Sequence, residues 1–135
     1  MLRLFDKKLK EKKLEEMLAL IDELVQLSQG SFFEWPPPTE IVSGKAAGPD
    51  TVGEIWAMRN GLPVKAFPAN WTTFGKAAGM VRNEKMAHYA DHALILWDGK
   101  SSGTKNMEDR MNSLGKEYII HNYLTMGPGE GILKV

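Results

Sequence analysis

Residues 92–105 read HALILWDGKSSGTK, a short apolar run followed by a loop of small and hydroxyl-bearing residues. The run His92–Trp97 is typical of a buried strand, and the amphipathic pattern of Lys105–Leu114 predicts a helix. The same order occurs earlier, where Thr39–Ser43 is a predicted strand and Pro49–Asn60 a predicted helix. A strand that leads through a short loop into a helix is the repeating unit of parallel α/β sheets.

The remaining segments extend this alternation. Apolar residues recur at helical spacing through residues 6–28, and Gly30 is placed to end that helix. Pro63–Phe67 and Glu117–Asn122 are predicted strands, and Gly75–Ala90 is predicted to be mostly helical. We therefore expect an α/β protein with a Rossmann-like three-layer fold, in which helices cover both faces of a mostly parallel sheet.

Composition and charge are those of one globular domain. The 135 residues are 43% hydrophobic and 25% charged, and 17 basic side chains balance 17 acidic ones, so net charge does not favour nucleic acid. The chain has no cysteine, which excludes disulfides and cysteine-ligated metals. No apolar run approaches the roughly 20 residues of a membrane span, and the start does not read as a signal peptide. We expect a cytoplasmic protein with no membrane partner.

Two loops rich in small residues come after predicted strands, at the sheet edge where α/β proteins bind ligands. They are Ser43–Asp50 (SGKAAGPD) and Asp98–Lys105 (DGKSSGTK). Small residues let the backbone approach an anion, and free N–H groups at a helix start point toward it. The alternative is that these residues only form tight turns and cap a helix. The second loop offers a phosphate the hydroxyls of Ser101, Ser102 and Thr104 and the ammonium of Lys100 or Lys105.

A third candidate is Arg82, which together with Asn83 is predicted to begin a stronger helical stretch. Arginine at a helix start opposes the helix dipole unless an anion is bound beside it. The alternative is a surface arginine with Asn83 next to it as the helix cap. Neither glycine-rich loop has the spacing of a Walker A or dinucleotide-binding motif, so the motifs leave the ligand unnamed.

Histidine and tryptophan do not indicate a further site. His88 and His92 are four residues apart, but His92 begins a predicted strand, so one helix does not carry both and no metal site is expected. The tryptophans are more typical of core or rim packing than of base stacking, because no basic patch accompanies them. They are Trp35, Trp56, Trp71 and Trp97.

The stretches IVSGKAAGPDTVGEIWA (41–57) and PVKAFPANWTTFGKAAGMVRNEKMAHYADHALILWDGKSSGTKNM (63–107) resemble a known family. It is the YspA-like, cpYpsA-related branch of the SLOG superfamily, which groups Smf/DprA proteins with the lonely-guy phosphoribohydrolases. The resemblance covers about Thr39–Tyr123 and implies a Rossmann-like fold that binds a nucleotide or nucleotide-derived ligand. The family pattern selects Ser43, Gly44, Asp50, Arg82, Asn83, Gly99, Ser101, Gly103 and Thr104 as ligand-binding positions.

The sequence departs from the family pattern in three ways. Relatives have a glycine where Lys45 stands and an arginine where Ala47 stands, so Lys45 is the cation left to this loop. Relatives begin with a central strand, which here is shortened to Leu2–Phe5 or missing; Ile132–Val135 or a partner chain could fill its place. The catalytic glutamate of the lonely-guy hydrolases is replaced by Met107, whose thioether cannot transfer protons.

We therefore expect one domain, made of an N-terminal helix and proline-rich connector (1–38), a core (39–123) and a tail (124–135). Its expected function is to bind a nucleotide-derived ligand at the carboxyl edge of the sheet, as a sensor or sequestering protein without a cofactor. One alternative is an N-glycosidic hydrolase, which would need a carboxylate from Asp50, Asp98 or Glu108. The other is a ligand-free interaction module, in which a homo-oligomer completes the sheet.

Overall fold

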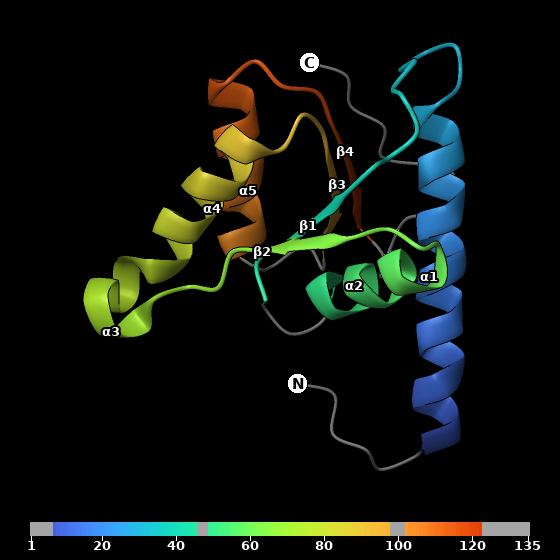
Figure 1. Ribbon diagram of the computed structural model, residues 1–135, viewed down its shortest axis with the longest axis horizontal. Coiled ribbons are helices and arrows are strands. Elements are labelled where there is room, and N and C mark those ends of the chain that lie inside the picture. Colours follow the sequence, from blue (N-terminus) through green and yellow to red (C-terminus); the bar gives the residue numbers. More distant parts are fainter. Residues whose placement is uncertain (1–6, 46–48, 98–101, 123–135) are drawn as a thin grey trace. The chain divides into compact units, whose positions relative to one another are not determined.

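The computed structural model describes residues 7–45, 49–97 and 102–122 of the chain (Figure 1). The chain forms two compact units, Met1–Ala66 and Phe67–Val135, called here the N-terminal and C-terminal units. Both contain helices and one pair of parallel strands, which is compatible with the expected α/β class. None of the helices among the described residues combines the length and apolar character that a bilayer span requires.

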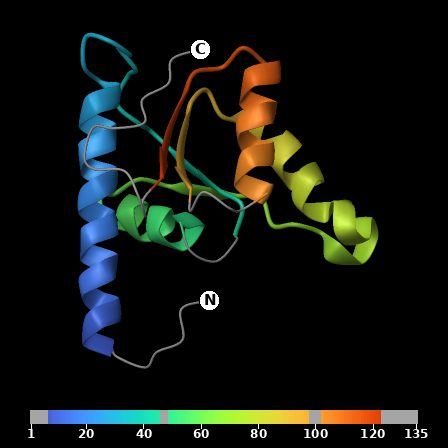
Figure 2. The same cartoon turned by 180° about the vertical axis from the view of Figure 1, so that it is seen from behind.

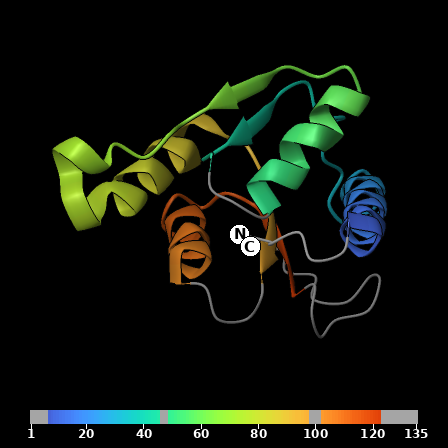
Figure 3. The ribbon, with the colours of Figure 1, turned by 90° about the horizontal axis from the view of Figure 1, so that it is seen from below.

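The N-terminal unit contains α1 (Lys7–Ser28), β1 (Ile41–Ser43), α2 (Pro49–Arg59) and β2 (Val64–Ala66). β1 and β2 pair in parallel, with Ile41 opposite Val64 and Ser43 opposite Ala66. Figure 3 shows α2 alongside this strand pair. These elements confirm the predicted order helix, strand, helix, strand, although each strand is shorter than its apolar run.

Two polar contacts fasten α1 to α2. Arg59 makes a bidentate pair with Glu15, with nitrogen–oxygen distances of 2.8 and 3.0 Å. The indole N–H of Trp56 donates to Asp22 Oδ1 at 2.6 Å. The apolar stripe predicted along residues 6–28 is confirmed in part: Leu18, Ile21 and Leu24 are buried, whereas Leu14, Met17, Val25 and Leu27 are half-buried. In α2, Trp56 and Ala57 are buried.

The C-terminal unit contains a single turn α3 (Trp71–Phe74), a 3₁₀ turn η1 (Gly75–Ala77), α4 (Ala78–Tyr89), β3 (Ala93–Trp97), α5 (Ser102–Ser113) and β4 (Tyr118–Asn122). β3 and β4 pair in parallel from Ala93 opposite Tyr118 to Trp97 opposite Asn122. Figure 2 shows α4 and α5 side by side, and α5 also packs against both strands. The strand–helix–strand order predicted around residues 92–122 is confirmed.

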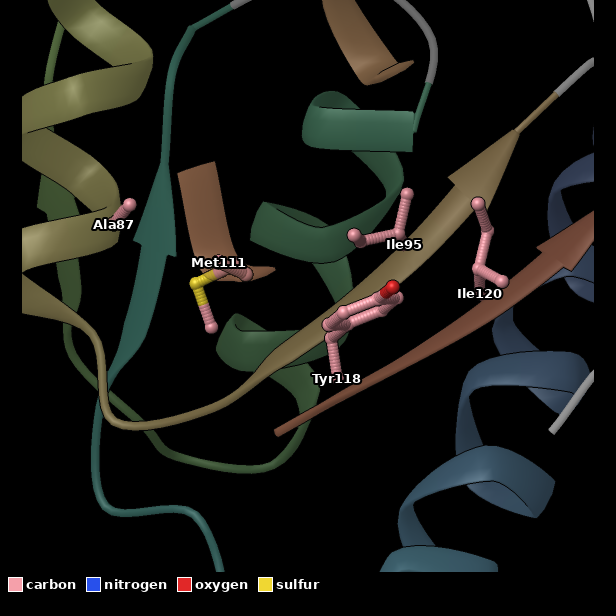
Figure 4. Close-up of a cluster of buried hydrophobic side chains, with 5 residues drawn as sticks. All are labelled: Ala87, Ile95, Met111, Tyr118 and Ile120. Atoms are coloured by element: carbon pink, nitrogen blue, oxygen red, sulfur yellow. The ribbon is translucent and has the colours of Figure 1, made fainter. Parts of the chain in front are cut away.

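One apolar cluster holds the C-terminal unit together (Figure 4). Met111 of α5 and Ala87 of α4 are fully buried and meet the side chains of Ile95, Tyr118 and Ile120 from the two strands. Tyr118 and Ile120 project from the same face of β4 because alternate residues of a strand share a face. Both helices and both strands therefore depend on this one contact region.

The helical stretch predicted over Gly75–Ala90 differs from the structure in where it begins. Gly75 has φ 55° and ψ −131°, a conformation outside the helical region, which separates α3 from η1 and α4. Gly79, in contrast, lies inside α4, which already begins at Ala78. The prediction that Arg82 and Asn83 begin a helical stretch is therefore wrong, and so is the alternative in which Asn83 caps it, because both lie in the second turn of α4.

Lys116 closes the carboxyl end of α4. Its ammonium donates to the carbonyl oxygens of Ala87, His88 and Ala90 at 2.8, 3.0 and 2.7 Å. The last carbonyls of a helix have no partners within it, and a cation there also interacts favourably with the helix dipole. This contact joins α4 to the segment that enters β4.

Lys116→Met is expected to lower the free energy of unfolding by about 1–2 kcal/mol, because three carbonyl groups lose a charged donor. Urea denaturation monitored by circular dichroism measures the change. The control is Lys76→Met, which alters an exposed lysine of the same unit and should stay within about 0.5 kcal/mol of the wild type. Equal stability of the two variants would contradict a capping role for Lys116.

The structure shows two separate pairs of parallel strands, one in each unit. The Rossmann-like three-layer fold and the single domain expected from the sequence therefore stay predictions. The segments Leu2–Phe5 and Ile132–Val135, considered as replacements for a missing central strand, lie outside the residues that the structure describes.

Candidate functional site

In the first candidate loop, in the N-terminal unit, Ser43 and Lys45 both contact the carboxylate of Glu54 in α2. Ser43 is buried at the end of β1, and its hydroxyl donates to Glu54 Oε2 at 2.9 Å and accepts from the Lys45 amide at 3.2 Å. The Lys45 ammonium pairs with the other carboxylate oxygen of Glu54. Hydrogen bonds from Lys45, and then from Ser43, hold the pKa of the Glu54 carboxyl below its ordinary value. The Ser43 hydroxyl and the Lys45 ammonium, which were expected to bind an anion, thus both bind the Glu54 carboxylate.

Lys45 also adopts an unusual backbone conformation, with φ at 60°. This left-handed region disfavours residues with a Cβ atom by roughly 1–2 kcal/mol and favours glycine. The loop therefore has the geometry of a glycine position although the sequence places lysine there. Gly44 is buried beside it, and the side chain of Asp50, the other predicted residue of this loop, lies outside what the structure describes.

The second candidate region lies in the C-terminal unit and is organised by Asn83, which is only 6% exposed. The Asn83 amide nitrogen donates to the Gly103 carbonyl at 2.9 Å and to Asn106 Oδ1 at 3.1 Å. Its amide oxygen accepts from Arg82 Nε at 3.1 Å. Asn83 therefore joins the second turn of α4 to the first turn of α5, and it holds Arg82 at that junction.

The structure thus brings together residues that are about 20 positions apart in the sequence. Ser102 and Gly103 are exposed at the amino end of α5, and Thr104 is half-buried. Because α5 begins at Ser102, Thr104 is its third residue rather than its cap, which corrects the alternative interpretation of that residue. The predicted residues Gly99 and Ser101, together with Lys100, lie outside the described residues.

The Lys105 ammonium is directed away from the amino end of α5 by its ion pairs. It contacts Glu108 Oε1 at 2.6 Å and Asp109 Oδ1 at 3.3 Å, both further along the helix. Hydrogen bonds from Glu108, and then from Asp109, raise the pKa of the Lys105 ammonium above its ordinary value. Arg82 Nε, in contrast, donates to the Asn83 side chain, which itself bonds to the first turn of α5.

Glu108, a candidate acid for a hydrolase, is 8% exposed. It is paired with Lys105 and interacts with Tyr118, whose hydroxyl pKa is raised by burial. Met107, at the position of the lonely-guy glutamate, packs against the apolar cluster. The Glu108 carboxylate is thus engaged in an ion pair, and the Met107 side chain is part of the apolar packing.

The tryptophan prediction holds for three of the four residues. Trp35 and Trp56 are buried, and Trp97 packs against the apolar cluster of the C-terminal unit. Trp71, in contrast, is 61% exposed. His88 pairs with Glu84, and the described part of the chain contains no group of three metal-ligating side chains.

Sequence reasoning missed two residues of this region. Asn106 supplies the second acceptor for the Asn83 amide, and the exposed Trp71 reaches Gly79 of α4. The spacing of Asn106 from Gly103, one helical turn, could have indicated the first residue. A single-turn helix such as α3 leaves no periodic pattern that could have placed the second.

Comparisons with known proteins do not extend the resemblance seen in the sequence: no protein-family model, no curated protein and no solved structure matches the chain.

Proposed function

We propose that the C-terminal unit binds the phosphate of a nucleotide-derived ligand at the amino end of α5 and acts as a sensor or sequestering protein. The observation that carries the proposal is the Asn83 junction. It fixes Arg82 beside the first turn of a helix that comes after a parallel strand, the edge at which α/β sheets bind ligands.

Two physical effects favour an anion here. The first turn of a helix has N–H groups without partners in the helix and carries the positive end of the helix dipole. A guanidinium group adds a planar, permanently charged donor that suits phosphate oxygens. Because Asn83 is buried and bonded on both sides of its amide group, the arginine backbone beside it is held in place before a ligand arrives.

The loop around Ser43 is the less suitable of the two regions, because its hydroxyl and its ammonium group are both engaged with a carboxylate. In the N-terminal unit, Glu54 takes both the hydroxyl of Ser43 and the ammonium of Lys45. An incoming phosphate would have to compete with that carboxylate. The proposed site contains four of the positions that the family resemblance selects, namely Arg82, Asn83, Gly103 and Thr104. The proposal includes a Rossmann-like arrangement of the whole chain.

The test is isothermal titration calorimetry of the full chain with nucleoside monophosphates. Arg82→Ala is expected to weaken binding by about 10- to 100-fold, because a charge-assisted hydrogen bond contributes about 1.5–3 kcal/mol. The matched control is Arg59→Ala, which removes an arginine paired with Glu15 in the other unit. It should leave the affinity unchanged.

Two results would contradict the proposal. One is equal affinity of Arg82→Ala and the wild type for every nucleotide that the wild type binds. The other is a wild-type protein that binds no nucleoside monophosphate and carries none when the purified protein is examined by native mass spectrometry.

A further inference from the structure

Trp71, Gly79 and Arg82 converge at one place on α4. A Cβ atom at position 79 would lie 3.7 Å from Arg82 Nη2 and 3.8 Å from Trp71 Cη2. Both side chains therefore reach over the same glycine, one from α3 and one from the next turn of α4. The Trp71 residue is nevertheless 61% exposed, so a large part of its indole surface faces solvent.

The position of Trp71 is set by its short helix. Asn70 caps α3, with its side-chain oxygen accepting from the Thr73 amide at 3.0 Å. Gly75 then ends α3, with its positive φ. The backbone that carries the indole is thus fixed on both sides. A fixed, exposed tryptophan leaves a large apolar ring in water, and such rings are typical of ligand contacts.

The indole is the end of a continuous series of groups. Trp71 and Arg82 both reach Gly79, Arg82 Nε is bonded to Asn83, and Asn83 is bonded to the first turn of α5. An aromatic face, a guanidinium and a helix amino end are therefore neighbours within one unit. A nucleoside phosphate presents the complementary series, because its base has a flat π-face and its phosphate carries the charge.

We propose that Trp71 is the platform on which the nucleobase of the ligand stacks, with Gly79 leaving room beside the ring. This inference rests on the proposed function and extends it from phosphate binding to recognition of a complete nucleoside phosphate. Stacking accepts every base, since each has a π-face, so the expected preference is for nucleotides over sugar phosphates rather than for one base.

The experiment compares AMP, GMP, CMP and UMP with ribose 5-phosphate, which lacks the base, by calorimetry on the full chain. The wild type should bind at least one nucleotide more tightly than ribose 5-phosphate. Trp71→Ala should weaken nucleotide binding by about 5- to 100-fold and leave ribose 5-phosphate binding unchanged. Trp71→Phe should keep most of the affinity, and Phe74→Ala, which removes another exposed aromatic ring of α3, should change neither ligand.

Gly79→Ala provides a second variant in case Trp71→Ala perturbs the fold. Alanine is a better helix former than glycine, and its Cβ would meet its neighbours at ordinary contact distance. The variant should be at least as stable as the wild type and yet bind nucleotides more weakly, because the added methyl group occupies the space beside the ring.

The outcomes separate this inference from the proposed function. If nucleotides bind the wild type but Trp71→Ala and Gly79→Ala bind them equally well, stacking on Trp71 is overturned and the phosphate site stands. If the wild type binds ribose 5-phosphate as tightly as every nucleotide, stacking is again overturned. If the wild type binds none of the five ligands and carries no nucleotide after purification, the proposed function itself fails.

Discussion

Met111→Ala is expected to lower the free energy of unfolding of the C-terminal unit by about 2–5 kcal/mol, the usual range for truncating a fully buried methionine. Met111 has no exposed surface and lies where α4, α5 and both strands meet (Figure 4). Removing its thioether leaves a cavity that four elements border, and close-packed neighbours collapse into such a space only in part.

Hydrogen exchange of the β3 and β4 amides, measured by mass spectrometry, assigns the loss to this unit. The control is Met80→Ala, which shortens a methionine of α4 that is 58% exposed and should change stability by less than about 0.5 kcal/mol. If the β4 amides exchange at the same rate in Met111→Ala and Met80→Ala, Met111 does not occupy the centre of the core.

Asn83→Asp is expected to be the most damaging change of a single atom, with a loss of about 2–4 kcal/mol in the free energy of unfolding. The substitution replaces the amide group that donates to Gly103 and Asn106 by a carboxylate oxygen. Two acceptors would then face a buried negative charge. The contact with Arg82 Nε offsets part of this repulsion but restores neither lost hydrogen bond.

Urea denaturation at pH 7 and pH 4 tests this expectation, each variant being compared with the wild type at the same pH. The deficit should shrink at pH 4, because a protonated carboxyl can again donate one hydrogen bond. Asn70→Asp is the control, since aspartate keeps the oxygen that caps α3. A deficit for Asn83→Asp no larger than that of the control would show that Asn83 does not join α4 to α5.

The regular elements were predictable because their signals are local. The apolar run from His92 to Trp97 identified β3, and the helical stripe of residues 6–28 identified α1 to within one residue. Parallel pairing within each unit was predictable from the strand–helix–strand order. This order does not determine where one strand pair lies relative to the other, because periodicity reports on single elements and not on how the units pack.

The residues of the site were only partly predictable, because their roles depend on partners far along the chain. The sequence singles out Arg82 and Asn83, but it predicts a helix start there because Gly79 reads as a break in the pattern, whereas α4 begins at Ala78. Asn83 bonds to a residue 20 positions away, and no local pattern encodes that contact. Likewise, the sequence of the small-residue loop does not reveal that Lys45 forms an ion pair with Glu54.

Strand pairing within each unit also has a consequence for how the chain folds. Ile41 pairs opposite Val64 and Ala93 opposite Tyr118, so each pair closes a loop of only about two dozen residues that contains one helix. Loop-closure entropy rises with the length enclosed, and rates of folding fall as contacts become more distant in sequence. On the ribosome, the strands of the N-terminal unit can therefore meet before synthesis of the C-terminal unit is complete, and neither pair has to wait for the other.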